Sequence, residues 1–324
     1  MKRCFLISIL IGVFLFSACG ASTDVPTETS GLSVVSTTFP GYDLARAVIG
    51  EKGTVTMLLS PGEETHSFDP TPADIIAVQE SDLFLYVGGE SDDWVRDLLA
   101  SMDTDAMNVI SLMDCVTLYE EESKDGMMES RGHDHEANHE EEDHEEEYDE
   151  HVWTSPKNAL IILRDIESRV CSMDAENADY YHANADRYAA ELEKLDKAFR
   201  DTVEQSESKT LLFGDRFPFL YFVREYGLDY YAAFPGCSSE TEPNAATIAF
   251  LIDKGREEKI PVVLKEKMSN DNIASAIAEE TGSKVCSLYA CHNIPADDFE
   301  NGETYVSLMN KNLVVLKEAL NGWH

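Results

Sequence analysis

The sequence predicts an α/β protein of two lobes, each a mostly parallel sheet flanked by helices, joined by one long rigid helix. The chain has 324 residues, more than one hydrophobic core usually organises. Short β-rich runs alternate with amphipathic stretches in two separate blocks, which is typical of parallel sheets covered by helices. Between the blocks, apolar residues recur at helical spacing over a long stretch.

The first block begins at Leu32. Its expected strands are 32–36, 54–59 and 82–88, and its expected helices are 42–50, 72–80 and 92–101. We assign residues 32–154 to an N-terminal lobe, which includes a disordered acidic loop at 120–150.

A helical region is expected at 155–206. Ser155 followed by Pro156 is a helix start, because a capping residue precedes a proline at the first helical position. Apolar residues at spacings of three and four then mark one face of a long helix. They are Tyr188, Leu192, Leu195, Phe199 and Val203. We expect this helix to join the lobes as a stiff backbone.

The second block supplies the C-terminal lobe, which we place at 207–324. Its expected strands are 210–214, 229–234, 261–266 and 284–289. Its expected helices lie near 216–226, 244–258, 271–281 and 303–320.

The N-terminus predicts export and a lipid anchor. Lys2 and Arg3 precede a short apolar run, so residues 1–18 are expected to be a signal peptide and not a membrane span. The sequence from Phe16 to Cys19 resembles a bacterial lipobox, although Phe16 stands where Leu is usual. Cys19 would carry the lipid, and 19–31 would be a flexible tether outside the cell membrane. The alternative is ordinary signal cleavage with release of the product.

Charge and cysteine content limit the partners. The formal net charge of −37 disfavours nucleic acid, because phosphate binding needs clustered Lys and Arg, and it favours cations. Beyond Cys19 the chain has Cys115, Cys171, Cys237, Cys286 and Cys291. One disulfide could form in an oxidising compartment. The pair we favour is Cys237 with Cys291, although spacing does not establish pairing.

The acidic loop at 120–150 holds too little apolar surface to fold by itself. We expect its histidines to act as weak, exchangeable metal ligands that raise the local metal concentration or sense saturation. They are His133, His135, His139 and His144. The alternative is an inert acidic linker. His135 and His139 also match the HExxH signature of zinc proteases, but no apolar stripe is present to dock such a helix, so we reject that activity.

Four residues follow expected strands, where ligands gather in open α/β sheets. His66 follows strand 54–59, His151 ends the acidic loop, Asp215 follows strand 210–214, and Glu266 closes strand 261–266. Two imidazoles and two carboxylates would form a four-donor site suited to zinc or manganese. Because the ligands must be deprotonated, affinity should fall as pH drops through the histidine range.

Each candidate also has a simpler interpretation. His66 could be a solvated turn residue, and His151 could be the last member of the histidine-rich tract. Asp215 could cap the following helix. Glu266, which lies between two lysines, could form a surface ion pair of little value.

Three motifs resemble the zinc- and manganese-binding lipoproteins of bacterial ABC importers. They are THSFDPTPADI around His66, HVWTSPKNA around His151 and ETGSKV at 280–285, and the resemblance runs from about Leu32 to Leu320. It implies two α/β lobes joined by a rigid helix, with one metal ion bound at their interface. It also implies delivery of that ion to a membrane permease driven by a cytoplasmic ATPase. We further expect a monomer.

The resemblance carries over unevenly to the four candidates. His66 and His151 match the family's first two histidine ligands. Asp215 falls where zinc binders usually have a histidine and manganese binders a glutamate, and Glu266 falls where the family has an Asp or Glu ligand.

Asp215 therefore leaves the choice of metal open. Carboxylates lean toward manganese, whereas the histidine-rich loop is the family's zinc-associated feature. His292, next to Cys291, could replace or supplement Asp215 or Glu266, and Glu240 and Glu242 are further carboxylates nearby. We favour zinc over manganese as the transported ion.

Two other classes of protein remain as alternatives to a non-enzymatic metal carrier. A zinc hydrolase would keep a coordination position open for water and need a general base, for which only Glu240 offers itself. A surface adhesin could share the same scaffold, since fold alone does not decide function.

Overall fold

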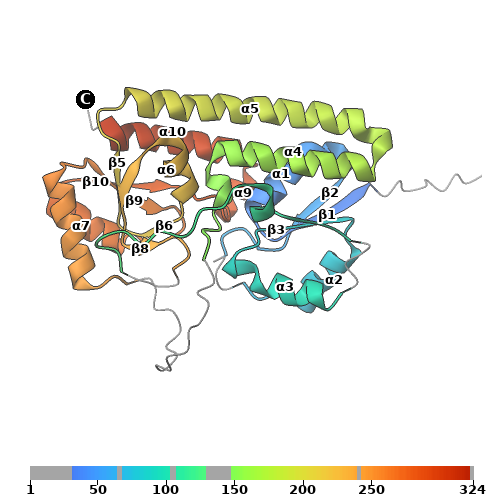
Figure 1. Cartoon of the computed structure of the whole chain (residues 1–324), viewed down its shortest axis with the longest axis horizontal. Helices are drawn as coiled ribbons and strands as arrows, with labels where there is room; N and C mark the ends of the chain where they lie inside the picture. Colours follow the sequence, from blue (N-terminus) through green and yellow to red (C-terminus); the bar gives the residue numbers. More distant parts are fainter. Residues whose placement is uncertain (1–30, 64–67, 103–106, 129–146, 239–241, 322–324) are drawn as a thin grey trace, which may run out of the picture. The chain divides into compact units, whose positions relative to one another are not determined.

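Two four-stranded parallel sheets organise the part of the chain that the structure, a computed structural model, describes (Figure 1). This part comprises residues 31–63, 68–102, 107–128, 147–238 and 242–321. Residues Gly31–His324 form one compact unit. The prediction of two α/β lobes with parallel sheets is confirmed, whereas the exact lobe limits stay a prediction.

The first sheet has the strand order β2-β1-β3-β4, and every neighbouring pair is parallel. Its strands are β1 (Leu32–Ser36), β2 (Gly53–Met57), β3 (Leu83–Tyr86) and β4 (Asn108–Ser111). The sequence analysis located the first three but missed β4. That strand has four residues, pairs on one side only, and shows too short an apolar run to stand out.

The second sheet has the order β10-β9-β5-β7 and is also parallel throughout. Its strands are β5 (Thr210–Phe213), β7 (Asp229–Tyr231), β9 (Val262–Glu266) and β10 (Lys284–Leu288). A small parallel pair, β6 (Arg216–Phe217) with β8 (Phe234–Pro235), adjoins this lobe. The expected strand 229–234 is therefore divided between β7 and β8.

Helices connect and cover these strands (Figure 1). They are α1 (Phe39–Ile49), α2 (Pro72–Glu80), α3 (Asp93–Ala100), α4 (Pro156–Met173), α5 (Ala178–Gln205), α6 (Leu220–Tyr226), α7 (Ala245–Glu257), α8 (Asn272–Thr281), α9 (Ala296–Glu300) and α10 (Tyr305–Asn321). As predicted, Ser155 caps α4 by accepting a hydrogen bond from the Asn158 backbone N–H, and Pro156 occupies the first turn.

Strand side chains alternate between one shared core and two outer cores. In β1, Val34 contributes to the shared core, while Val35 packs on the other face with α2 and α3. In the second sheet, Val262 enters the shared core, whereas Val263 packs toward α7 and α8. This period of two places helices on both faces of each sheet.

The long helix α5 lies against both lobes. It contacts α1 and α4 of the first half of the chain and α10 of the second (Figure 1). Its 28 residues span about 42 Å, and the predicted apolar face is buried. A fully buried carboxylate, Asp43 of α1, accepts hydrogen bonds from the Tyr188 hydroxyl of α5 and the Tyr305 backbone N–H. These bonds tie three helices together, which supports the predicted role of α5 as a rigid connection.

The search for membrane-spanning helices covered the described residues. None of the helices there is both long and apolar enough to cross a bilayer.

Candidate metal centre

A small polar pocket lies where the segment before α4 meets the carboxyl ends of strands. Its volume is about 50 Å³, which suits an ion with a few waters. Its lining includes His151 and His292, the carboxylate residues Glu63 and Glu266, the cation Arg216, and Asn293. The positive charge of Arg216 opposes a bound cation, so anionic ligands are required to balance it.

His151 is buried at the end of the acidic segment and is held by its neighbour Asp149. The Asp149 carboxylate accepts a hydrogen bond from the His151 backbone N–H at 2.8 Å and lies 3.2 Å from the ring Nδ1. An ionised carboxylate only accepts hydrogen bonds, so Nδ1 carries the proton and Nε2 keeps its lone pair. This is the usual arrangement of a metal-binding histidine.

The electrostatic surroundings of His151 are strongly negative. Burial alone would lower the pKa of His151, but the carboxylates of Asp149, Glu150 and Glu121 raise it above its usual value. A site that favours positive charge on an imidazole also favours a bound cation in its place.

His292 reaches the pocket from the loop after β10. The preceding residue, Cys291, has a φ of 58°, a left-handed conformation that is rare for a residue with a side chain. Such backbone costs roughly 1–3 kcal/mol and persists where surrounding packing enforces it. Here Cys291 is buried in the shared core, and His292 O accepts a hydrogen bond from Phe39 N at 3.2 Å.

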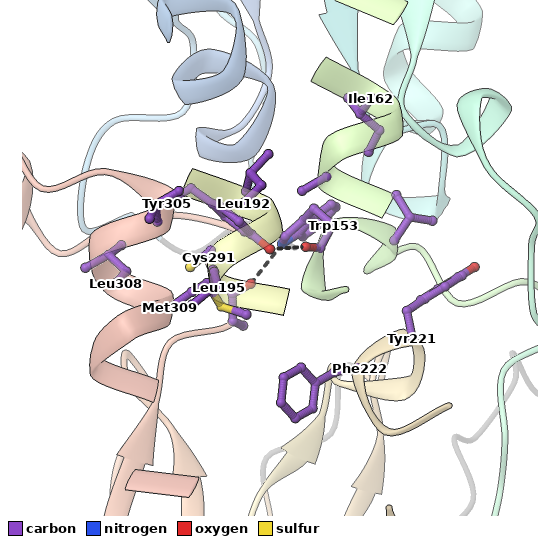
Figure 2. Close-up of a cluster of buried hydrophobic side chains, with 14 of the residues drawn as sticks. Trp153, Ile162, Leu192, Leu195, Tyr221, Phe222, Cys291, Tyr305, Leu308 and Met309 are labelled. Carbon is purple, nitrogen blue, oxygen red and sulfur yellow. Dashed lines mark hydrogen bonds between the residues drawn. The ribbon is translucent and has the colours of Figure 1, made fainter. Parts of the chain in front are cut away.

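Trp153 joins the two histidine-bearing segments. Its indole Nε1–H donates to Ala290 O at 2.8 Å, and its own carbonyl accepts from the Tyr305 hydroxyl at 2.7 Å. Figure 2 shows Trp153 and Tyr305 within the buried cluster, next to Cys291. The indole ring also lies 4.9 Å from the His292 ring, centroid to centroid. The core therefore positions both histidines through one fully buried tryptophan.

The two imidazoles converge. Their ring centroids are 5.3 Å apart and their planes are nearly perpendicular, at 87°. One ligand atom each from Glu150, His151 and His292 lies within 4.8 Å of the other two, and all three residues are buried. Two nitrogens and one carboxylate oxygen at this separation are a donor set that suits zinc.

The loop that leads to His66 is anchored at the same place. The side-chain amide of Asn293 donates to Ser60 O and to Glu63 O, each at 2.8 Å, and Gly62 N donates to Ile294 O at 2.9 Å. His66 itself lies outside the described residues, so its role as a ligand stays a prediction.

Asp215 and Glu266 form a separate hydrogen-bonded corner. Asp215 Oδ2 accepts from the Glu266 backbone N–H at 3.0 Å and from the Ser269 hydroxyl, and Oδ1 accepts from Arg216 N. Glu266 lines the pocket, and its Oε2 accepts from the backbone N–H groups of Met268 and Ser269. Burial, helped by the Asp215 carboxylate, raises the pKa of Glu266 to about 7. Asp215 is absent from the pocket lining, whereas Glu266 shares that lining with His151 and His292.

Two expectations are corrected by the structure. The N-cap interpretation of Asp215 is wrong, because the next helix, α6, begins five residues later at Leu220. The disulfide between Cys237 and Cys291 is also wrong, since all five described cysteines are free. Cys237 instead lies near Asp149 and His151, with ligand atoms within 4.8 Å, and burial holds the pKa of its thiol well above the usual value.

The remaining predicted residues lie outside the described part of the chain. These are Cys19, Glu240 and the loop histidines His133, His135, His139 and His144. Asp149 and Glu150 were not among the predicted site residues. An Asp two residues before a ligand histidine is a recognisable signal for Asp149, but Glu150 was hidden in an acidic tract.

Two α/β lobes with a small histidine-lined pocket at their strand ends define a protein built to bind a small ion. The chain belongs to the family described as zinc-uptake complex component A, periplasmic, whose sequence pattern matches residues 34–319.

Two curated relatives illustrate the family. ZnuA, the high-affinity zinc uptake system protein of Bacillus subtilis strain 168, is 31% identical over 312 residues, covering 94% of both chains. The zinc-binding lipoprotein AdcA of Streptococcus pneumoniae is 29% identical over 316 residues, which span 95% of this chain but 60% of AdcA.

Solved structures show the same fold. The Zn(II)-bound ZnuA-like domain of Streptococcus pneumoniae AdcA has a TM-score of 0.73 at 26% identity, covering 90% of this chain and 100% of the domain. The laminin binding protein Lmb of Streptococcus agalactiae, described as having adhesin and metal transporting activity, has a TM-score of 0.72 at 27% identity. That match covers 90% of this chain and 100% of Lmb.

Proposed function

We propose that this protein captures zinc outside the cytoplasm and hands it to an uptake complex. The observation that carries the proposal is the buried, nearly perpendicular pair of His151 and His292 beside a pocket of about 50 Å³. Membership of a zinc-uptake family and the zinc named for ZnuA and AdcA support the same conclusion.

In this proposal His151 binds the ion through Nε2, because Asp149 holds Nδ1. His292 supplies the second imidazole. His66 is the third histidine that we propose, on the loop tethered by Asn293. Asp215 and Glu266 stay predicted ligands. Glu266 lines the same pocket as the two histidines, whereas Asp215 does not. Glu240 stays an auxiliary prediction.

Zinc is favoured over manganese by the donor atoms. Imidazole nitrogens suit zinc, whereas manganese prefers carboxylate, carbonyl and water oxygens. The pocket is also far below the several hundred Å³ of usual organic-substrate sites, which supports a carrier and disfavours a hydrolase.

The proposed partners are a membrane permease and its cytoplasmic ATPase. The signal-like residues 1–18 and the lipobox-like Cys19 support anchoring by lipid at the outside of the cell membrane. We also propose that the protein is a monomer. The loop histidines would hold exchangeable zinc near the pocket, and both ends of that loop are tied together at the Glu120–Tyr148 bridge.

Thermal unfolding with zinc or manganese tests the cargo. A ligand at a thousandfold excess over its dissociation constant stabilises the folded state by about 4 kcal/mol. We expect zinc to raise the midpoint of wild-type protein more than manganese does, and to raise the midpoint of His151→Ala much less. Equal stabilisation of wild type and His151→Ala would overturn the proposed site, and a larger effect of manganese would overturn the proposed cargo.

Adhesion is the second candidate function, and the similarity to Lmb is the observation that favours it. Immobilised laminin is the probe. Saturable binding of the zinc-loaded chain would support this role, and binding no stronger than to albumin would exclude it.

A further inference from the structure

Glu150, the residue before His151, has a buried carboxylate that packs against the loop after β3. It is 1% exposed, and its Oε2 accepts hydrogen bonds from Ser91 N at 3.2 Å and Ser91 Oγ at 2.9 Å. Gly89 lies against the same side chain, and a Cβ there would come within 2.2 Å of Oε2 and 2.5 Å of the Glu150 Cβ. The loop after β3 therefore holds the carboxylate in one place.

The other carboxylate oxygen lacks a partner in the protein. Oε1 of Glu150 is buried and accepts no hydrogen bond from any described residue. A buried charge without a partner costs several kcal/mol, so such groups are usually paired with a cation or coordinate a metal.

Glu150 forms a cluster of buried metal-binding side chains with two imidazoles. One of its oxygens lies within 4.8 Å of a ring nitrogen of both His151 and His292. Ligand atoms on one tetrahedral zinc ion are about 3.4 Å apart, given metal–ligand distances near 2.1 Å. A shift of roughly one ångström per side chain would bring all three atoms onto one ion.

We propose that Glu150 is a ligand of the bound zinc, supplying a carboxylate oxygen through Oε1 while Ser91 holds Oε2. This inference rests on the proposed function, because it concerns the ion bound by His151 and His292.

The ligand role places Glu150 ahead of the carboxylates that follow β5 and β9. Both oxygens of Asp215 and Oε2 of Glu266 accept hydrogen bonds from backbone N–H groups or the Ser269 hydroxyl, whereas Oε1 of Glu150 is fully buried with no such donor among the described residues.

Zinc affinity of the full chain, measured by competition with a chromophoric chelator, tests the proposal. Glu150→Gln keeps the size of the side chain and an acceptor for Ser91 but removes the charged donor. We expect its zinc affinity to fall by more than about tenfold, because loss of a group that only supports a metal ligand already costs ~10–100-fold. Asp229→Asn is the matched control, because it removes an exposed negative charge that lies outside the cluster, and we expect a change of less than about threefold.

Gly89→Ala supplies a second variant that leaves the Glu150 carboxylate in the chain. Its new Cβ displaces the carboxylate, so zinc affinity should again fall, by less than in Glu150→Gln. Thermal unfolding of each zinc-free variant verifies that it is folded. The visible spectrum of the cobalt-substituted protein should differ between wild type and Glu150→Gln, because the ligand set changes.

Two outcomes overturn the proposal. One is a Glu150→Gln affinity within about threefold of wild type, and the other is an unchanged cobalt spectrum in that variant. Failure of the proposed function is distinguishable, since it would appear as a wild-type protein that binds no zinc or as His151→Ala binding equally well.

Discussion

Two regions of this molecule place buried carboxylates near the pocket, and they differ in what satisfies their oxygens. In the corner formed by Asp215, Glu266 and Ser269, backbone N–H groups and a hydroxyl donate to the carboxylates. In the cluster formed by Glu150, His151 and His292, Oε2 of Glu150 accepts from Ser91, but its Oε1 is buried without a donor among the described residues. One ligand atom from each of the three residues lies within 4.8 Å of the other two. The comparison teaches that position after a strand is insufficient for metal binding, because a donor atom must also be free of internal bonds.

The largest expected effect comes from removing the imidazole of His151. His151→Ala should weaken zinc binding by more than about 100-fold, beyond the ~10–100-fold range for outer-shell partners. Asp215→Asn is the comparison variant, and we expect it to lose far less. Competition titration with a chelator measures both. Equal losses would break the distinction between the two regions.

Asp92 is another buried carboxylate, close to Glu150, and its titration should make the stability of the fold depend on pH. Burial raises its pKa to about 6, aided by Glu150, against the hydrogen bond from Val87 N. The folded protein therefore retains this proton up to about pH 6, whereas the unfolded chain releases it near 3.8. Stability should fall as pH rises through this window, by up to about 3 kcal/mol.

Urea denaturation of zinc-free protein at either end of that window measures the effect. Asp92→Asn, which cannot titrate, should lose this part of the pH dependence and serves as the control. A slope that is the same in wild type and variant would show that Asp92 does not cause it.

The next effect concerns the group that orients His151. Asp149→Asn keeps the shape of the side chain but removes the carboxylate that holds Nδ1–H, so zinc affinity should fall ~10–100-fold. Asp229→Asn, an exposed carboxylate paired with Lys124, is a control that should leave zinc affinity unchanged. Zinc titration measures both variants. Equal zinc affinities of the two would contradict this role for Asp149.

The smallest effect should come from the hydrogen-bonded corner. Ser269→Ala removes the hydroxyl that donates to Asp215, and we expect a loss of about 1 kcal/mol in the free energy of unfolding. Zinc affinity should stay within about threefold of wild type. Removing a group that holds a metal ligand in place would weaken binding by ~10–100-fold. A larger loss of affinity would show that this corner belongs to the metal site.

Much of the fold followed from local pattern. The strand and helix alternation, the Ser155–Pro156 helix start and the buried face of α5 were all predicted and are present. One simpler alternative was wrong, whereas the prediction of Asp215 as a metal ligand stays a prediction. Asp215 resembled a helix cap, but its oxygens bond to Glu266 and Ser269, and α6 begins later.

The candidate site was only partly predictable. His151 was recognisable from its motif, and His292 was proposed only as an auxiliary ligand. Nothing local to Glu150 separates it from the many carboxylates before it. Its burial against Gly89 and Ser91 arises from residues far away in the chain.

The amino-acid order alone thus determined the architecture, the family and one of the paired histidines, because periodicity and motifs are encoded by neighbouring residues. Only the tertiary structure decided which donors meet. His151 precedes α4 and His292 follows β10, and Trp153 bridges them by bonding to Ala290. Convergence of this kind depends on packing between distant segments, which no local pattern records.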